Sequence, residues 1–354
     1  MKLSDDKILQ NDLDMIVNND CICWDKLRNQ SIFVTGATGL IGSQIVMSLL
    51  NANSENNLNL TVIAAVRNKE KAEKIFRYAD KKALTFIVQD ILEPFTFADS
   101  VDYIIHGASM TSSKDFVDYP VETIKTALVG TENILNLAKK KNIKGMVYLS
   151  SLEVYGVVDF SIEKVSENMF GTIDPMSVRS SYSEGKRMVE CLCASYAHQY
   201  NLPIKVARLC QTFGPGVSYG DNRVFAQFAR SVIEGNDIVL KTDGSTERNY
   251  CYIRDAISGI LTIMLNGNKG EAYNVANKNT LITIRGMAEL LIDMYPQSGT
   301  KLVFDIAEDV TKLGYNPKVK MNLDTSKLET LGWSAEVDLQ KMFEHLITSM
   351  KFNK

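Results

Sequence analysis

A tyrosine and a lysine four residues apart form the pair in this sequence best suited to acid–base chemistry. Tyr182 and Lys186 lie in a segment whose pattern predicts a helix over 182–200, and this spacing places both side chains on one helix face. A nearby ammonium, together with an oxidised nicotinamide, lowers the pKa of a phenol, so we expect Tyr182 to act as a base near neutral pH. The segment Ser150–Gly156 offers hydroxyls that could hydrogen-bond the same substrate oxygen.

A glycine-rich loop predicts a dinucleotide site. Gly36, Gly39 and Gly42 stand between a β-branched strand over 31–35 and a helix. The first glycines let the backbone turn tightly and approach a pyrophosphate, and the last allows close packing of the helix on the strand. The unpaired N–H groups at the helix N-terminus would then bind the anion.

The end of the next strand indicates which dinucleotide is bound. The strand over 60–66 is followed by Arg67, whereas an adenosine ribose with a free 2′-hydroxyl is commonly held by a carboxylate at this place. Arg67 therefore favours NADP(H) over NAD(H), with a solvated strand end as the alternative. Asp90, after the third strand, is placed to face the adenine ring.

Strands and helices alternate through the first 210 residues. Strands are predicted over 31–35, 60–66, 84–88, 103–105, 146–149 and 204–209, with long helices over 121–140 and 182–200. This alternation predicts an α/β protein with a doubly wound parallel sheet, the Rossmann fold. After Cys210 the alternation ends, and a smaller mixed C-terminal region is expected to hold the substrate.

We expect the chain to be organised in three parts. The first is an N-terminal helical extension over 1–29, in which Ile8, Leu13, Ile16 and Val17 have the spacing of a short amphipathic helix. The second is the dinucleotide-binding domain over 30–210, to which residues 251–276 return. The third is a substrate-binding region formed by 211–250 and 277–354.

The composition excludes several classes of function. A net charge of −3 over 354 residues, with 45% hydrophobic residues, is typical of a globular protein and argues against a nucleic-acid partner. No apolar run approaches the ~20 residues that span a bilayer, and the N-terminus does not resemble a secretory signal. We therefore expect a cytoplasmic protein without a membrane partner. Six cysteines and three histidines offer no zinc framework, so no metal is expected.

These motifs together resemble the extended short-chain dehydrogenase/reductases, the nucleotide-sugar epimerase/dehydratase/decarboxylase family, over roughly residues 31–345. The motifs that carry the resemblance are Gly36–Gly42, His106–Ser109, Ser150–Gly156, Tyr182–Arg187, Ala207–Gly216, Arg248–Asp255 and Leu331–Trp333. The resemblance implies that Ser151, Tyr182 and Lys186 are catalytic and that the substrate is a nucleotide-diphosphate sugar. It also implies a tightly bound NAD(P). The expected cofactor-binding residues are Gly36, Thr38, Gly39, Leu40, Ile41, Gly42, Arg67, Asp90, Ile91, Gly107, Ala108, Ser109 and Lys186.

Within this family the local similarity is greatest to the UDP-glucuronate decarboxylases. Glu153 matches the glutamate of their strand-end motif, and Arg179 is also similar. Leu152 stands where the 4,6-dehydratases carry an aspartate, and leucine cannot donate a proton to a leaving 6-hydroxyl. Met110 and Gln211 depart from the decarboxylase pattern, so the sugar remains open. The residues expected to contact the substrate are Ser109, Glu153, Arg179, Gln211 and Arg248.

Some of these residues have a structural alternative. Glu153 could serve only as a hydrogen-bond acceptor at a strand end, and Arg248 could be a surface cation rather than a ligand of the diphosphate. His106 is expected to be a packed histidine rather than an acid or base. Tyr155 and Tyr250 are expected to be packing residues or aromatic walls.

The expected reaction begins with oxidation of the sugar at C4. Tyr182 removes the hydroxyl proton, Ser151 holds the oxygen, and Lys186 fixes Tyr182 and the nicotinamide ribose. The 4-ketone acidifies C3 and C5 and, where C6 is a carboxylate, promotes loss of CO2, with Glu153 handling a proton at C5 or C6. Simple 4-epimerisation and 4-ketoreduction remain open, and a non-catalytic dinucleotide-sensing protein is the alternative outside enzymology.

The helices over 121–140 and 182–200 are expected to form a homodimer interface. Members of the resembled family commonly pair through equivalent helices in a two-fold, self-complementary contact. The candidate interface residues are Ile124, Leu128, Leu135, Met188, Leu192 and Tyr196. The alternative is that these apolar residues only cover the sheet.

Overall fold

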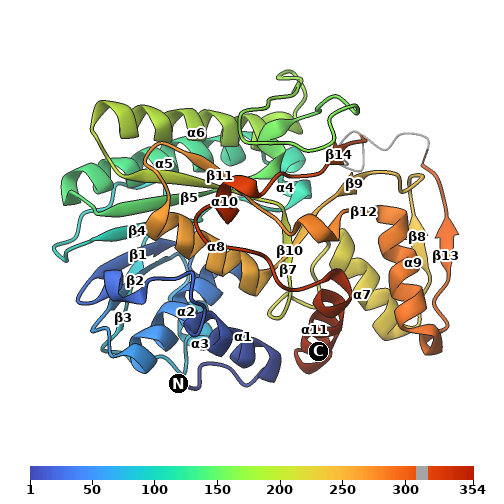
Figure 1. Cartoon of the computed structure of the whole chain (residues 1–354), viewed down its shortest axis with the longest axis horizontal. Helices are drawn as coiled ribbons and strands as arrows, with labels where there is room; N and C mark the ends of the chain where they lie inside the picture. The colour runs from blue at the N-terminus through green and yellow to red at the C-terminus, as the bar shows by residue number, and fades with distance from the viewer. Residues whose placement is uncertain (308–317) are drawn as a thin grey trace.

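A seven-stranded parallel sheet forms the centre of the protein (Figure 1), whose computed structural model describes residues 1–307 and 318–354. The sheet order is β11-β6-β5-β4-β1-β2-β3. Its strands are β1 (Ser31–Thr35), β2 (Thr61–Val66), β3 (Leu84–Val88), β4 (Tyr103–His106), β5 (Gly145–Ser151), β6 (Ile204–Leu209) and β11 (Ala272–Val275). The chain order reverses between β1 and β4, as a doubly wound fold requires. The expected Rossmann fold is confirmed.

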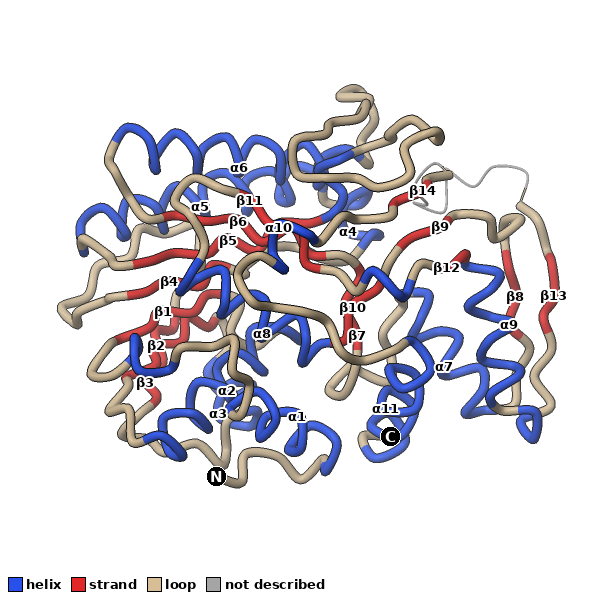
Figure 2. The backbone as a smooth tube through the Cα atoms, viewed as in Figure 1, coloured by secondary structure: helices blue, strands red, loops and turns tan. Residues whose placement is uncertain are grey.

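Helices cover both faces of this sheet (Figure 2). One face is covered by α2 (Leu40–Asn56), α3 (Lys69–Ile75) and α8 (Ile253–Asn266), the other by α4 (Ser113–Asp118), α5 (Pro120–Lys141) and α6 (Ser180–Gln199). Strand side chains alternate between the two apolar cores that result: Ile32 and Val34 of β1 join the α2 side, and Phe33 joins the α5 side. This period of two is what a strand buried on both faces produces.

The N-terminal extension packs on the body of the protein. Its helix α1 (Lys7–Val17) lies against α2, α8 and α11 (Leu339–Phe352), and a 3₁₀ turn, η1 (Trp24–Leu27), leads to β1. Leu9 is buried together with Leu13, Ile16 and Val17, whereas Ile8 is only half-buried. Three of the four residues expected on the apolar face are therefore buried, and Leu9 takes the place of Ile8.

The rest of the C-terminal half forms a third apolar core beside the sheet. Its remaining strands are β7 (Gln211–Phe213), β8 (Ile238–Leu240), β9 (Glu247–Arg248), β10 (Tyr250–Tyr252), β12 (Ile282–Thr283), β13 (Leu302–Phe304) and β14 (Lys320–Met321). Its remaining helices are α7 (Val224–Glu234), α9 (Ile284–Met294) and α10 (Ser326–Glu329), with short 3₁₀ turns at η3 (Lys278–Thr280) and η4 (Pro296–Ser298). Phe213, Phe225 and Phe343 stack together in this core, with ring centroids 4.5 and 4.9 Å from that of Phe213.

No helix in the described part of the chain is long and apolar enough to cross a membrane. The six cysteines are free thiols, and the C-x-C pair on α6 is split between two faces, with Cys191 exposed and Cys193 buried. The parallel strands of the sheet all present their carboxyl ends to the same edge, where the loops of the candidate site meet.

Candidate active site

The glycine loop after β1 has the geometry of a dinucleotide cradle. Gly36 has a φ of 70°, and a Cβ at this position would lie 2.7 Å from the carbonyl carbon of Gly107. A Cβ at Gly42 would overlap the Gly36 carbonyl, so only glycine lets α2 start this close to the strand. Gly39 is the N-cap of α2 and provides no side-chain cap, which leaves the first N–H groups of the helix available to an anion. These features fit a pyrophosphate.

The other proposed cofactor residues lie around this loop. Thr38 belongs to the turn before α2, and Leu40 and Ile41 form the first turn of that helix. Ser109 lies in the loop after β4, where its hydroxyl donates to the carbonyl of Met110 at 3.1 Å.

Buried His106 forms hydrogen bonds at the base of the loops that follow β1 and β4. The Thr35 hydroxyl lies 2.6 Å from Nδ1 of His106 and accepts a hydrogen bond from the N–H of Ala108, while Thr131 lies 2.9 Å from Nε2 of His106. Burial, and then the charge of Lys186, lowers the pKa of His106 to about 3. The imidazole is neutral and fully hydrogen-bonded, so the expectation of a packed histidine is confirmed.

The residues expected to face the adenosine follow β2 and β3. Arg67 is exposed directly after β2. The next side chain, Asn68, caps α3 by accepting from the N–H of Lys71 at 2.8 Å, so it is already engaged. Asp90 is exposed and accepts from the N–H of Leu92, while Ile91 is buried against α5.

Tyr182 and Lys186 lie on the face of α6 that is turned toward the end of β5. Lys186 is buried, and its Nζ donates to the carbonyl of Leu149 at 2.7 Å. The same ammonium lies 4.6 Å from the ring centroid of Tyr148 and 5.7 Å from that of Tyr182. Burial lowers the pKa of Lys186 to about 8.

A short helix that the sequence did not reveal holds the tyrosine ring. Phe116 of α4 stacks on Tyr182 with ring centroids 4.2 Å apart and planes 12° from parallel. The Ser181 hydroxyl donates to the carbonyl of Phe116, which ties α4 to α6. Six residues are too few for a helical period to be read from the sequence, so Phe116 was not identified.

The protein by itself raises the pKa of Tyr182. The lowering expected from Lys186 together with an oxidised nicotinamide concerns the protein with its cofactor bound. Burial is the main cause and the negative charge of Glu153 adds to it, whereas the Ser151 hydroxyl and Arg179 act in the opposite direction. The Lys186 ammonium donates to the Leu149 carbonyl and lies 5.7 Å from the ring centroid of Tyr182, and it does not offset this rise.

Glu153 is held in place by two side chains at the start of α6, one from its N-cap residue and one from its first turn. Arg179 donates to both carboxylate oxygens, at 3.0 and 3.1 Å, and the Ser183 hydroxyl donates to one of them at 2.9 Å. The backbone N–H of Glu153 donates to Oγ of Ser151. Ser183 was not identified from the sequence, although its place next to Tyr182 brings it to the same end of the helix. The structure thus joins Ser151, Glu153, Arg179 and the helix of Tyr182 in one cluster.

The remaining substrate candidates lie on the C-terminal half. Gln211 of β7 pairs with Tyr250 of β10, and Arg248 lies on β9, whose neighbours are β12 and β14. Nε of Arg248 and the hydroxyl of Tyr250 are buried without a hydrogen-bond partner among the described residues. Arg248 is thus half-buried at a strand end, which differs from a solvated surface cation.

Comparisons with known proteins agree with this geometry. The family model described as "NAD dependent epimerase/dehydratase family" matches residues 32–276. UDP-glucuronic acid decarboxylase 3 of Arabidopsis thaliana is 30% identical over 327 residues, which cover 92% of this chain and 89% of that protein.

Solved structures show the same fold. A dTDP-glucose 4,6-dehydratase from Streptomyces venezuelae with NAD bound has a TM-score of 0.74 at 23% identity and covers 92% of this chain and 98% of its own. UDP-glucuronic acid 4-epimerase from Bacillus cereus in complex with NAD has a TM-score of 0.73 at 24% identity, with 92% and 100% covered. The match of the family model over most of the chain, and the likeness to the plant decarboxylase along nearly its whole length, show that this protein belongs to the NAD-dependent epimerase/dehydratase family.

Proposed function

We propose that the protein is an enzyme that modifies a nucleotide-diphosphate sugar through a transient 4-keto intermediate. The observation that carries this proposal is the cluster of Ser151, Tyr182 and Lys186 at the carboxyl end of β5, beside the glycine loop. The relatives named above act on UDP-glucuronic acid and dTDP-glucose. We further propose that residues 211–250 and 277–354 hold the sugar nucleotide, with Arg248 directed to the diphosphate.

In this proposal each residue of the cluster has one role. Tyr182 accepts the proton of the C4 hydroxyl, and Ser151 holds the C4 oxygen by a hydrogen bond. Lys186 stays cationic and fixes the cofactor ribose. A nicotinamide held there by Lys186 would supply the acceptor for the C4 hydride, and its positive charge would stabilise the phenolate of Tyr182.

Among the possible outcomes, we propose decarboxylation of a nucleotide-linked uronic acid. Loss of CO2 from C6 leaves its electron pair on C5, conjugated with the 4-ketone, and a proton added at C5 followed by return of the hydride to C4 balances the reaction. Glu153, held beside Ser151, supports a second proton transfer of this kind. Leu152 is 5% exposed and belongs to the main core, so no acid group acts from that position to expel a 6-hydroxyl.

Three finer features are part of the proposal. Arg67 at the exposed end of β2 supports a preference for NADP(H), through an ion pair with the 2′-phosphate. The exposed apolar side chains of Ile124 on α5 and Met188 on α6 support a homodimer. A cytoplasmic location is supported by the six free thiols.

One of the residues expected in a dimer interface does not fit it. Leu135 is fully buried in the core between α5 and the sheet, so it cannot contact a partner. Helical period explains the difference, because the position of Leu135 on α5 points to the sheet rather than to solvent.

Incubation with a panel of nucleotide sugars tests the proposed function. UDP-glucuronic acid, UDP-glucose and dTDP-glucose are each added to the purified protein with NAD or NADP, and products are identified by mass spectrometry. We expect loss of 44 mass units, the mass of CO2, from the uronic acid alone, and product formation that is roughly 10²–10⁴-fold slower with the Tyr182→Phe variant. Product from a neutral sugar alone, with no change in mass, would instead favour 4-epimerisation. Failure of every nucleotide sugar would contradict the proposal.

A further inference from the structure

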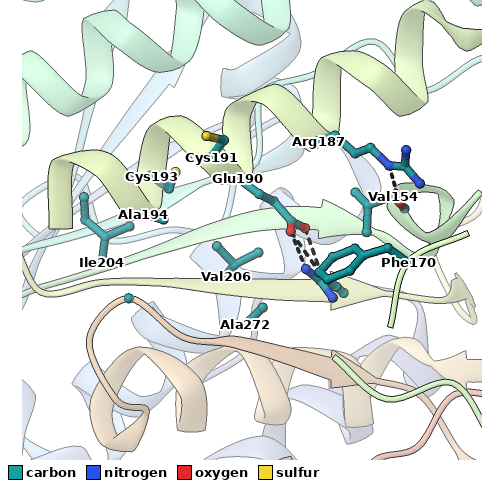
Figure 3. Close-up of a pocket in the computed structure, with 12 residues that line it drawn as sticks. Val154, Phe170, Arg187, Glu190, Cys191, Cys193, Ala194, Ile204, Val206 and Ala272 are labelled. Carbon is teal, nitrogen blue, oxygen red and sulfur yellow. Dashed lines mark hydrogen bonds and ion pairs between the residues drawn. The ribbon is translucent and has the colours of Figure 1, made fainter. Parts of the chain in front are cut away.

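An ion pair outside the catalytic cluster connects α6 to the sheet (Figure 3). Glu190 on α6 faces Arg208 on β6, whose Nε donates to both carboxylate oxygens at 3.1 Å and whose Nη2 donates to one of them at 2.7 Å. The two side chains are 12% and 6% exposed. They lie beside a cavity of about 440 Å³ lined by apolar residues of α6, β6 and β11, and by Phe170.

The same ion pair binds the end of the catalytic strand. The Ser150 hydroxyl donates to Oε1 of Glu190 at 2.5 Å, and Ser150 is paired with Arg208 in the register of β5 and β6. Three consecutive residues of β5 therefore each make a defined contact. Leu149 accepts from Lys186, Ser150 binds Glu190, and Ser151 enters the catalytic cluster.

Arg208 is itself fixed by further contacts. Its Nη1 donates to the Tyr155 hydroxyl at 3.0 Å and to the carbonyl of Glu167 at 2.8 Å. The Tyr155 hydroxyl donates in turn to Oδ1 of Asn274 on β11. The guanidinium cannot turn away from Glu190 without breaking this network, so the position of the carboxylate is set from the sheet.

Glu190 also lies one helical turn after Lys186. The spacing of four residues places both on the same face of α6. The titratable groups around the Lys186 ammonium are Tyr148 on β5, His106 on β4, and Tyr182, Glu190 and Cys193 on α6. Glu190 is the one carboxylic acid of this set, and it forms an ion pair with Arg208. It opposes the effect of burial on the pKa of Lys186.

We propose that Glu190 and Arg208 are positioning residues of the catalytic cluster, which hold the end of β5 against α6 and keep the Lys186 ammonium charged. Removal of the Glu190 charge would leave Arg208 as an unopposed cation near a buried lysine. Lys186 would then lose its proton at a lower pH. This inference rests on the role proposed above for Lys186, but its electrostatic part concerns the protein itself and can be measured without a substrate.

The test follows the titration of Lys186 by NMR in the full chain, labelled with ¹³C at lysine Cε. A Lys186→Arg variant assigns the signal. We expect Glu190→Gln to lower the titration midpoint of Lys186 by roughly one pH unit. Arg208→Gln should raise the titration midpoint of Lys186, because the negative charge of Glu190 is then no longer balanced by Arg208. Glu184→Gln is the matched control: it makes the same substitution on the same helix at a side chain that is 39% exposed, and it should leave the midpoint unchanged.

Each outcome supports or overturns the inference. Circular dichroism shows whether the Glu190→Gln variant is folded. If it is folded and the titration midpoint of Lys186 is unchanged, the ion pair has only a structural role. If Glu190→Gln does not fold, Arg208→Gln provides the test, and a midpoint that does not rise overturns the proposal. Once a substrate is known, the alkaline limb of the kcat profile of Glu190→Gln should move to lower pH with the Lys186 titration. A shifted titration without turnover on any nucleotide sugar would contradict the proposed function and leave this inference standing.

Discussion

The guanidinium of Arg179 donates to both oxygens of the Glu153 carboxylate, at 3.0 and 3.1 Å. The two side chains are only 13% and 12% exposed, so the pair is a bidentate contact in a largely dry environment. The ion pair fixes the carboxylate next to Ser151. The negative charge of Glu153 raises the pKa of Tyr182 further, in addition to the effect of burial. Glu153 is therefore anchored structurally, and its part in proton transfer must be separated from this anchoring by experiment.

Substitution of Glu153 by glutamine separates the two roles. Glutamine keeps an oxygen for Arg179 and Ser183 but cannot exchange a proton. We expect Glu153→Gln to complete the first half-reaction and to accumulate reduced cofactor with a 4-keto sugar, which a single-turnover absorbance trace would record. Glu163→Gln, at an exposed loop residue, should turn over normally. Unchanged turnover of Glu153→Gln would assign the carboxylate a purely structural role and favour 4-epimerisation or ketoreduction.

Substitution of Tyr182 by phenylalanine removes the proposed base while keeping the stack on Phe116. We expect every activity of the enzyme to fall by roughly 10²–10⁴-fold, the usual contribution of general acid–base catalysis. Initial-rate measurements with the true substrate check this. The control is Tyr200→Phe at the end of the same helix, where the ring is 37% exposed, and it should keep the wild-type rate. A loss smaller than tenfold in Tyr182→Phe would mean that another group acts as the base.

The cofactor preference depends on the charge after β2. We expect the wild-type protein to bind NADP(H) at least as tightly as NAD(H), and Arg67→Asp to reverse this order by repelling the 2′-phosphate and accepting from the ribose hydroxyls. Fluorescence titration of both reduced cofactors measures the ratio. Lys69→Asp makes the same change of charge two residues further on, at an exposed position, and should affect the ratio little. A clear preference of the wild-type protein for NAD(H) would refute this prediction.

A homodimer through α5 and α6 predicts a mass twice that of the chain in light scattering at micromolar concentration. Ile124 and Met188 are 40% and 56% exposed, and a lysine at either position would bury a charge in the interface. We therefore expect Met188→Lys to shift the protein toward monomer. Val239→Lys on β8, where the valine is 46% exposed, should leave the mass unchanged. A monomeric wild-type protein would rule out this interface.

A buried carboxyl links the N-terminal helix to stability against pH. The Tyr252 hydroxyl donates to Asp12 at 2.6 Å and lies 2.6 Å from Nδ1 of His345 on α11. Burial raises the pKa of Asp12 from 3.8 to about 7. A carboxyl with a raised pKa stabilises the fold while it is protonated, so this contribution is complete below about pH 4 and is lost as the pH rises through about 7.

Asp12→Asn removes this dependence because asparagine does not titrate. We expect the melting temperature of the variant, relative to that of the wild-type protein, to be higher at pH 8 than at pH 5. Calorimetry at the two pH values measures this difference. Asp14→Asn, on the same helix but exposed, is the control and should show a smaller change with pH. An equal difference at both pH values would show that Asp12 does not contribute a pH-dependent term between pH 5 and pH 8.

The sequence alone determined the features that depend on local backbone geometry and on side-chain period. Glycines at 36, 39 and 42 after a buried strand are required by close contacts of the backbone, and the same requirement appears as the positive φ of Gly36 and the start of α2 at Leu40. Alternation along β1 and the four-residue spacing of Tyr182 and Lys186 likewise follow from strand and helix geometry. The Rossmann fold and the shared helix face of Tyr182 and Lys186 could therefore be predicted.

Only the tertiary structure decided the contacts between segments that are distant in sequence. Three such contacts join different elements: the ion pair of Arg179 with Glu153, the stacking of Phe116 on Tyr182, and the ion pair of Glu190 with Arg208. The direction of the Lys186 ammonium also depends on how α6 packs against β5, and so does the burial that raises the pKa of Tyr182. Such contacts are selected by the packing of whole helices and strands, which no local period encodes.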